Sequence, residues 1–238
     1  MSNFGDHPAG FFGVSGFYNG VATTSLRLDK ASTGYLHRTP SGASNRRTFT
    51  ISFWYKTSIV FASEGNDQNN PIFYADEPSG GGVFALNVSG QGQGASRDTV
   101  NEMQYYDYDS ADSTDYGLET NRGFSDPNAW YHLVWAFDTT QGTEANRVKV
   151  YINGVQHAYT DMNQHHGAVI QNRELNVNDA VPHWIGRNID TTSRYMNGYL
   201  ADFNFIDGTQ YAASNFGEFK NGIWIPKEPN VTYGTNGF

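Results

Sequence analysis

The 238-residue chain carries 15 Lys and Arg against 24 Asp and Glu, and its net charge of −9 disfavours binding to a phosphate backbone. It contains no cysteine, which excludes disulfide scaffolds, cysteine-ligated zinc and thiol nucleophiles. Aromatic residues (15%) nearly match charged residues (16%) and 26 residues are glycine, a composition typical of short strands and many turns.

The first 24 residues have neither a helical nor a two-residue period. They mix five glycines with aromatic side chains, which suits neither a core of their own nor full exposure to water. We expect an N-terminal arm over residues 1–24 and one domain over residues 25–238. Two roles are open for the arm: it adds a strand to its own domain, or it becomes ordered by docking on a partner. In the second case the anchoring side chains are Phe4, Phe11, Phe12, Phe17 and Tyr18.

Segments with a two-residue period follow between clusters of turn residues. Residues 26–28, 48–55 and 83–88 alternate apolar and polar or small side chains, as half-buried strands do. The side chains that this alternation points inward are Leu26, Leu28, Phe49, Ile51, Phe53, Tyr55, Phe84, Leu86 and Val88.

Residues 130–138 carry bulky side chains on both faces, which predicts a central strand covered on each side. Residues 148–152 alternate again and lead directly into Asn153-Gly154. This dipeptide accepts the positive φ angles of a type I′ turn, and it predicts a tight hairpin.

Further strands are expected over residues 183–188 and 197–208. In the second, alternation assigns one face to Tyr199, Ala201, Phe203 and Phe205. A single helical turn is expected near residues 213–216, and residues 222–238 suggest an extended strap over the domain. Many short antiparallel strands predict an all-β, two-sheet jelly-roll sandwich. The core candidates are Phe49, Ile51, Phe53, Trp54, Trp130, Leu133, Trp135, Val148, Val150, Ile152, Trp184, Ile185, Leu200, Phe203 and Phe205.

Two consecutive segments, DPNAWYHLVWAFD and RVKVYINGV, resemble the middle of laminin G-like and pentraxin-like domains of the concanavalin A-like lectin/glucanase superfamily. A wider series of segments resembles lectin-like domains in virion proteins of marine tailed bacteriophages. These segments are SLRLDKASTGYLHRTPSGASNRRTFTISFW, HWIGRN, NGYLADFNFIDG, FGEFKNGIWIPKE and YGTNGF. The resemblance covers about residues 25–238. It implies an antiparallel jelly roll used on virus particles for surface display or adhesion, and fold alone does not decide function.

No catalytic pattern is found. Glucanases of this superfamily resemble one another in a Glu-x-Asp-x-Glu strand, which this chain lacks, and its eight glutamates are scattered. There is no Gly-x-Ser-x-Gly elbow for a nucleophilic serine. His132 is expected to pack on the sheet, and His165-His166 to lie in a solvated loop without metal. We therefore expect a protein that is not an enzyme and has no cofactor.

The stretch MQYYDYDSADSTDYG, residues 103–117, is the most distinctive segment. Four aspartates in nine residues (Asp107, Asp109, Asp112 and Asp115) could share calcium, but their spacing misses the EF-hand pattern, and a solvated loop is expected instead. Its tyrosines suit contacts between subunits, which we place ahead of stacking on sugar rings. The candidate binding residues are Tyr105, Tyr106, Asp107, Tyr108, Asp109 and Tyr116.

The expected function is that of a non-enzymatic structural protein on the surface of a tailed-phage virion, made in the host cytoplasm, most simply a capsid decoration or accessory protein. Its expected partners are the major capsid protein or tail components and further copies of itself. No nucleic acid partner is expected because the net charge is negative. No membrane insertion is expected because no apolar run approaches the roughly 18 residues of a membrane span. The alternative is a carbohydrate-binding adhesin or tail-fibre tip that recognises host surface glycans, and an endoglycosidase is a third, weaker hypothesis.

Overall fold

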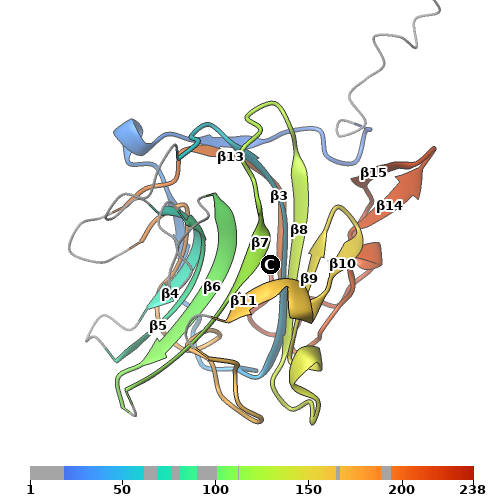
Figure 1. Cartoon of the computed structure of the whole chain (residues 1–238). Helices are drawn as coiled ribbons and strands as arrows, with labels where there is room; N and C mark the ends of the chain where they lie inside the picture. Colours follow the sequence, from blue (N-terminus) through green and yellow to red (C-terminus); the bar gives the residue numbers. More distant parts are fainter. Residues whose placement is uncertain are drawn as a thin grey trace, which may run out of the picture.

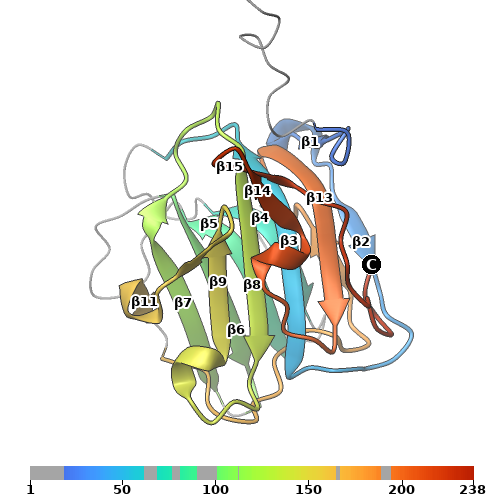
Figure 2. The same cartoon turned by 90° about the vertical axis from the view of Figure 1, so that its right-hand side faces the viewer.

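The computed structural model describes residues 19–61, 69–76, 81–89, 101–111, 113–164, 167–188 and 194–238. In these ranges the chain forms two large antiparallel sheets that lie face to face (Figures 1 and 2). Aromatic and aliphatic side chains pack between the sheets. The predicted all-β, two-sheet jelly-roll sandwich is confirmed. None of the short helical turns in the described ranges has the length or apolar character that a membrane crossing requires.

The six-stranded sheet has the order β1-β13-β3-β8-β9-β10. Its strands are β1 (Leu26–Leu28), β3 (Thr48–Thr57), β8 (Tyr131–Asp138), β9 (Val148–Ile152), β10 (Val155–His157) and β13 (Gly198–Asp207). The seven-stranded sheet has the order β11-β7-β6-β5-β4-β12-β2. Its strands are β2 (Leu36–Arg38), β4 (Asn70–Asp76), β5 (Gly82–Ser89), β6 (Glu102–Asp109), β7 (Thr114–Gly123), β11 (Met162–Gln164) and β12 (His183–Ile185).

A separate hairpin joins β14 (Gly217–Lys220) to β15 (Ile223–Pro226). The connections contain four 3-10 turns: η1 (Lys30–Ser32), η2 (Glu144–Asn146), η3 (Tyr159–Asp161) and η4 (Ala213–Asn215). The last of these is the single helical turn predicted near residues 213–216.

Alternation in β3 and β8 builds the core. Phe49, Ile51, Phe53 and Tyr55 of β3 are fully buried between the sheets, as predicted, and Phe49 stacks on Phe137 of β8 with ring centroids 4.5 Å apart. Burial of each such side chain stabilises the fold by about 1.5–3 kcal/mol. All the core candidates named from the sequence are buried or partly buried, although three of the tryptophans, Trp54, Trp130 and Trp184, pack in clusters on the outer faces of the sheets.

The outer face of β8 is covered by the C-terminal segment. Val134 and Ala136 are fully buried there, in a cluster with Phe216 against which Trp224 and Tyr233 pack. β8 is therefore a central strand covered on both sides, and the predicted strap over the sandwich is confirmed.

Trp224 ties this cover to the sheet. Its Nε1–H donates to Nδ1 of His132 at 3.0 Å. Because an indole N–H can only donate, the hydrogen of neutral His132 is on Nε2, which donates to Ser52 Oγ at 3.0 Å. Burial lowers the pKa of His132 to about 3, so it is uncharged at neutral pH. The expectation of a histidine packed on the sheet is confirmed.

The alternation predicted for β13 is wrong in its first half. The register with β3 shifts around Asp202, which adopts a φ of 49°, so the strand contains a β-bulge. The extra residue moves the following side chains to the opposite face. Consequently Leu200 belongs to the core together with Phe203 and Phe205, whereas Ala201 belongs to an outer cluster with Trp54. Local alternation does not reveal a bulge.

The last residues of the predicted arm already belong to the domain. The Asn19 side chain donates from Nδ2 to the carbonyl oxygen of Pro226 at 2.7 Å, and Ala22 is buried against Trp54 and Ala201. The candidate anchoring residues lie outside the described residues: Phe4, Phe11, Phe12, Phe17 and Tyr18.

Replacing Gly154 by Ala should lower the free energy of unfolding more than replacing Gly208 by Ala. Both glycines have a positive φ (83° and 91°), so each variant incurs backbone strain of about 1 kcal/mol or more. Only at Gly154, in the type I′ turn, would the added Cβ also come within 2.3 Å of the Trp224 ring, while nothing lies within 4 Å at Gly208. Urea unfolding of both variants measures the difference, and equal losses would show that Trp224 is not tightly seated.

Candidate binding site at the rim of the sandwich

The Tyr- and Asp-rich segment of residues 103–117 forms the β6–β7 hairpin, so the predicted solvated loop is wrong. The deciding pattern is the alternation of Tyr105 and Asp107 with Tyr106 and Tyr108, because a strand points successive side chains to opposite faces. The six candidate binding residues are therefore distributed over both faces of the sheet and do not form one surface.

Two of the candidate tyrosines belong to the core. Tyr105 is fully buried, and its ring lies edge-on to Phe137 with centroids 5.1 Å apart. Burial raises the pKa of Tyr105 well above its ordinary value. Tyr116 is also buried, beneath the guanidinium of Arg173 at 5.3 Å from the ring centroid. Neither ring is available to a glycan or a subunit, so the binding role expected for them is wrong.

Asp107 is buried where the loop of residues 167–182 meets the end of the sandwich. The backbone N–H of Asn176 donates to Asp107 Oδ1 at 2.7 Å, and the Asn176 side chain donates to the carbonyl oxygen of Tyr108 at 2.7 Å. Burial raises the pKa of Asp107 to about 7, although the Asn176 hydrogen bond and Arg173 act in the opposite direction. Asp107 thus holds Asn176 in place instead of meeting a ligand.

Tyr106 and Tyr108 lie on the outer face of the seven-stranded sheet. Strand register places Tyr106 in one row with Ala85, Tyr74 and Trp184 across β5, β4 and β12. These four side chains form an apolar cluster of their own. The row packs on the sheet, and the thickness of the sheet separates it from Tyr105 and Asp107.

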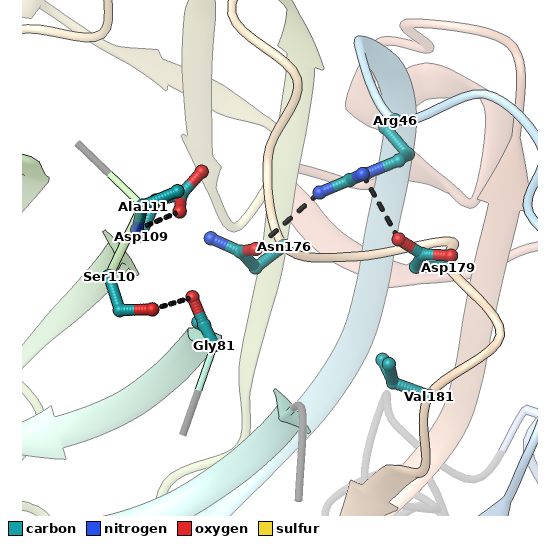
Figure 3. Close-up of a pocket in the computed structure, with 9 residues that line it drawn as sticks. Arg46, Gly81, Asp109, Ser110, Ala111, Asn176, Asp179 and Val181 are labelled. Atoms are coloured by element: carbon teal, nitrogen blue, oxygen red, sulfur yellow. Dashed lines mark hydrogen bonds and ion pairs between the residues drawn. The ribbon is translucent and has the colours of Figure 1, made fainter. Parts of the chain in front are cut away.

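Asp109 is the candidate residue that lines a cavity. The cavity has a volume of about 240 Å³ and lies at the rim of the sandwich, between the start of β5, the β6–β7 turn and the loop of residues 167–182 (Figure 3). We call it the rim pocket. Its lining residues are Arg46, Gly81, Gly82, Asp109, Ser110, Ala111, Asn176, Asp179 and Val181. Most of these present hydrogen-bonding atoms, so the pocket suits a polar ligand.

Ion pairs shape the rim pocket. Arg46 Nη1 lies 3.0 Å from Asp179 Oδ2, and Arg173 Nη2 lies 3.0 Å from Asp109 Oδ2. Arg46 also donates from Nη2 to Asn176 Oδ1 at 3.4 Å. The sequence did not reveal this site, because Arg46 and Asp179 stand far apart in the chain within segments that predict only polar loops.

Three of the four aspartates considered for calcium lie in the described residues, and these three do not converge. Asp107 points into the domain and Asp109 lines the rim pocket, whereas register places Asp115 opposite the outward-facing Tyr108. Asp112, His165 and His166 lie outside the described residues. Across the described ranges, no three His, Asp or Glu side chains are grouped so that they could hold a metal ion.

The arrangement of the sheets agrees with a match to a known family. Residues 30–213 match the Laminin_G_3 family model, described as the concanavalin A-like lectin/glucanases superfamily. The chain belongs to this superfamily. The laminin G-like resemblance seen in the sequence is confirmed at this level. No curated protein matches the chain.

Solved laminin structures share this fold at low sequence identity. Domains LG4-5 of the mouse laminin α1 chain match with a TM-score of 0.50 and 10% identity, over 80% of this chain and 43% of that one. The LG1-3 region of the laminin α2 chain matches with a TM-score of 0.50 and 11% identity, over 77% and 31%. The enzymatically active domain of tailspike protein 2 from bacteriophage CBA120 matches with a TM-score of 0.49 and 11% identity, over 82% and 26%. The chain spans less than half the length of these proteins, and such identities show the fold alone.

The concanavalin A-like fold also brings together two glutamates that appear scattered in the sequence. Glu102 of β6 and Glu119 of β7 are both buried on the outer face of the seven-stranded sheet, where Glu119 pairs in register with Gln104. Burial, and then the charge of Glu102, raise the pKa of Glu119 to about 8. The sequence signals this pair only through the two-residue period of residues 102–109 and 114–119. We did not use that period, because we expected a loop there.

Replacing Glu119 by Gln should increase stability at alkaline pH. The folded state binds a proton at Glu119 that the unfolded state releases near its ordinary pKa of 4.5. The contribution of Glu119 to the free energy of unfolding of the wild-type protein is therefore fully present below about pH 4.5. It declines by up to about 1.4 kcal/mol per pH unit as the pH rises towards 8. Urea unfolding of both proteins at several pH values should show that the difference between their free energies of unfolding grows as the pH rises from about 4.5 to 8.

The exposed Glu218 provides the matched control variant Glu218→Gln, unfolded in urea at the same pH values. A constant difference for Glu119→Gln would contradict the raised pKa.

Proposed function

We propose that this chain is a non-enzymatic structural protein of a tailed-phage virion, a capsid decoration or accessory protein that displays its lectin-like domain on the particle surface. The series of segments similar to lectin-like domains of phage virion proteins supports the assignment to a particle. The observation that carries the display role is the polarity of the domain, because the described chain begins beside the β14–β15 hairpin and the rim pocket lies at the other end of the sandwich.

One contact and the place of one loop define this polarity. The hydrogen bond from Asn19 to Pro226 holds the start of the described chain beside the β14–β15 hairpin, which lies at the upper right in Figure 1 and in the upper half of Figure 2. The loop of residues 167–182, which lines the rim pocket, lies at the bottom of both views. An arm that binds the particle would therefore leave the rim pocket facing outward.

The surface beside Asn19 suits a protein partner. Phe219 and Ile223 of the β14–β15 hairpin are 57% and 58% exposed, and within the described residues this hairpin pairs with no other strand. Exposed apolar side chains of this size contribute about 1.5–3 kcal/mol each when a partner covers them. We propose the major capsid protein or a tail component as that partner, with further copies of this chain as neighbours.

Deleting residues 2–18 should leave a folded domain that no longer associates with virions. The deletion spares Asn19 and Ala22, whose contacts belong to the domain. Co-sedimentation of the full and shortened chains with purified particles lacking this protein measures the association, and circular dichroism checks the fold. A shortened, folded chain that still sediments with the particles would contradict anchoring through the arm.

The rim pocket favours a second candidate, a carbohydrate-binding adhesin or tail-fibre tip. Its carboxylates accept hydrogen bonds from sugar hydroxyls, and the guanidinium of Arg46 and the amide of Asn176 donate to them. The pocket contains no aromatic lining residue, so recognition would rest on hydrogen bonds rather than on stacking.

Replacing Asp179 by Asn should weaken binding to host surface glycans about tenfold or more, because one charge-assisted acceptor is lost. The exposed Asp161, which does not line the pocket, provides the control variant Asp161→Asn. Binding is measured on immobilised host polysaccharide, and release of reducing ends is followed in the same samples. Equal binding by both variants would contradict the pocket, and steady release of reducing ends would contradict the non-enzymatic assignment.

A further inference from the structure

Each carboxylate that lines the rim pocket is already paired with an arginine. Asp179 is paired with Arg46 and Asp109 with Arg173, both at 3.0 Å. The arginine side chains are only 22% and 12% exposed, so solvent screens these pairs less than it screens fully exposed ones. The two aspartates of the lining are thus each neutralised by an arginine, although Arg173 itself does not line the pocket and Arg46 also lies 4.0 Å from Glu174.

Further contacts hold the hydrogen-bonding atoms of the pocket in fixed directions. Arg46 donates from Nε to the carbonyl oxygen of Leu175 at 2.9 Å. The Asn176 side chain donates to the carbonyl oxygen of Tyr108 and lies against Gly82, where an added Cβ would come within 2.4 Å of it. Groups held in this way lose little conformational entropy when a ligand binds.

This set of groups does not fit a divalent cation of the kind considered for the aspartates. Calcium takes about six to eight oxygen ligands, including several carboxylates. Within the described residues the pocket offers two carboxylates, each in contact with a guanidinium whose N–H groups can only donate. In the described part of the chain no third acidic or histidine side chain joins them. Calcium would have to displace two arginines.

We propose that the rim pocket binds an uncharged, polyhydroxylated ring, such as the terminal sugar of a glycan, directly through the Arg46–Asp179 pair, Asp109 and Asn176, without a divalent cation. This inference rests on the glycan-binding candidate above. In this proposal the arginines replace a bound cation. They supply the positive charge that holds the two aspartates in place.

The charge balance and the size of the pocket select the ligand class. A hydroxyl group can donate to an aspartate and accept from a neighbouring arginine or amide at the same time, so neither ion pair has to break. A charged ligand would have to compete with Asp179 for Arg46 or with Arg46 for Asp179. The volume of about 240 Å³ is below the roughly 300–1,000 Å³ of sites for drug-sized ligands, which suits one ring rather than a longer chain.

The test uses the full chain and named probes: the methyl glycosides of glucose, galactose and mannose, with methyl glucuronide as the anionic counterpart. Saturation-transfer NMR and titration calorimetry are run with calcium in excess and again with EDTA. We expect at least one neutral glycoside to bind with equal affinity in both buffers. Arg46→Gln should weaken that binding about tenfold or more, whereas the exposed Arg122→Gln should not.

Each other outcome decides against part of the proposal. Binding that disappears in EDTA overturns the inference and leaves the glycan candidate standing. Tighter binding of methyl glucuronide than of every neutral glycoside overturns the uncharged ligand class. No binding of any probe in either buffer overturns the inference and the glycan candidate together, while the virion role is judged separately by co-sedimentation. If Arg46→Gln fails to fold, the comparison of buffers with the wild-type chain still decides.

Discussion

The structure depends on the burial of β8 on both of its faces. Leu133, Trp135 and Phe137 pack between the sheets, while Val134 and Ala136 need a second cover on the outside. The C-terminal segment supplies that cover. As it crosses the sheet, this segment brings Pro226 beside Asn19. The cover over β8 therefore also determines where the N-terminal arm joins the domain.

Polar groups buried within the fold are stabilised in two ways. On the outer face of the seven-stranded sheet Glu119 takes up a proton, because burial and Glu102 disfavour its charge. At the rim Asp109 is paired with Arg173 and Asp179 with Arg46. Charge that is paired and held near the surface remains available for hydrogen bonding to a ligand, which is why the rim is the better candidate site.

The proposed display role and the proposed sugar site are compatible because they use opposite ends of the sandwich. A strand of 10 residues such as β3 spans about 33 Å. A partner bound beside Asn19 and the β14–β15 hairpin would therefore not reach the rim pocket. The two proposals can succeed or fail independently.

The sequence by itself determined the strands of the core, the Asn153-Gly154 turn, the packed His132 and the C-terminal cover, because alternation, turn chemistry and bulk on both faces are local properties. It did not determine the bulge at Asp202, whose cause is pairing with a neighbouring strand. Nor did it determine the β6–β7 hairpin, since the polarity of the segment outweighed its two-residue period in the prediction.

Only the tertiary structure decided which charges meet. Glu102 and Glu119 become neighbours by strand pairing, and Arg46 reaches Asp179 only when the loop of residues 167–182 closes over the end of the sandwich. Such contacts depend on the distance between segments remote in the chain, and that distance is set by the packing of the two sheets rather than by any local pattern of residues.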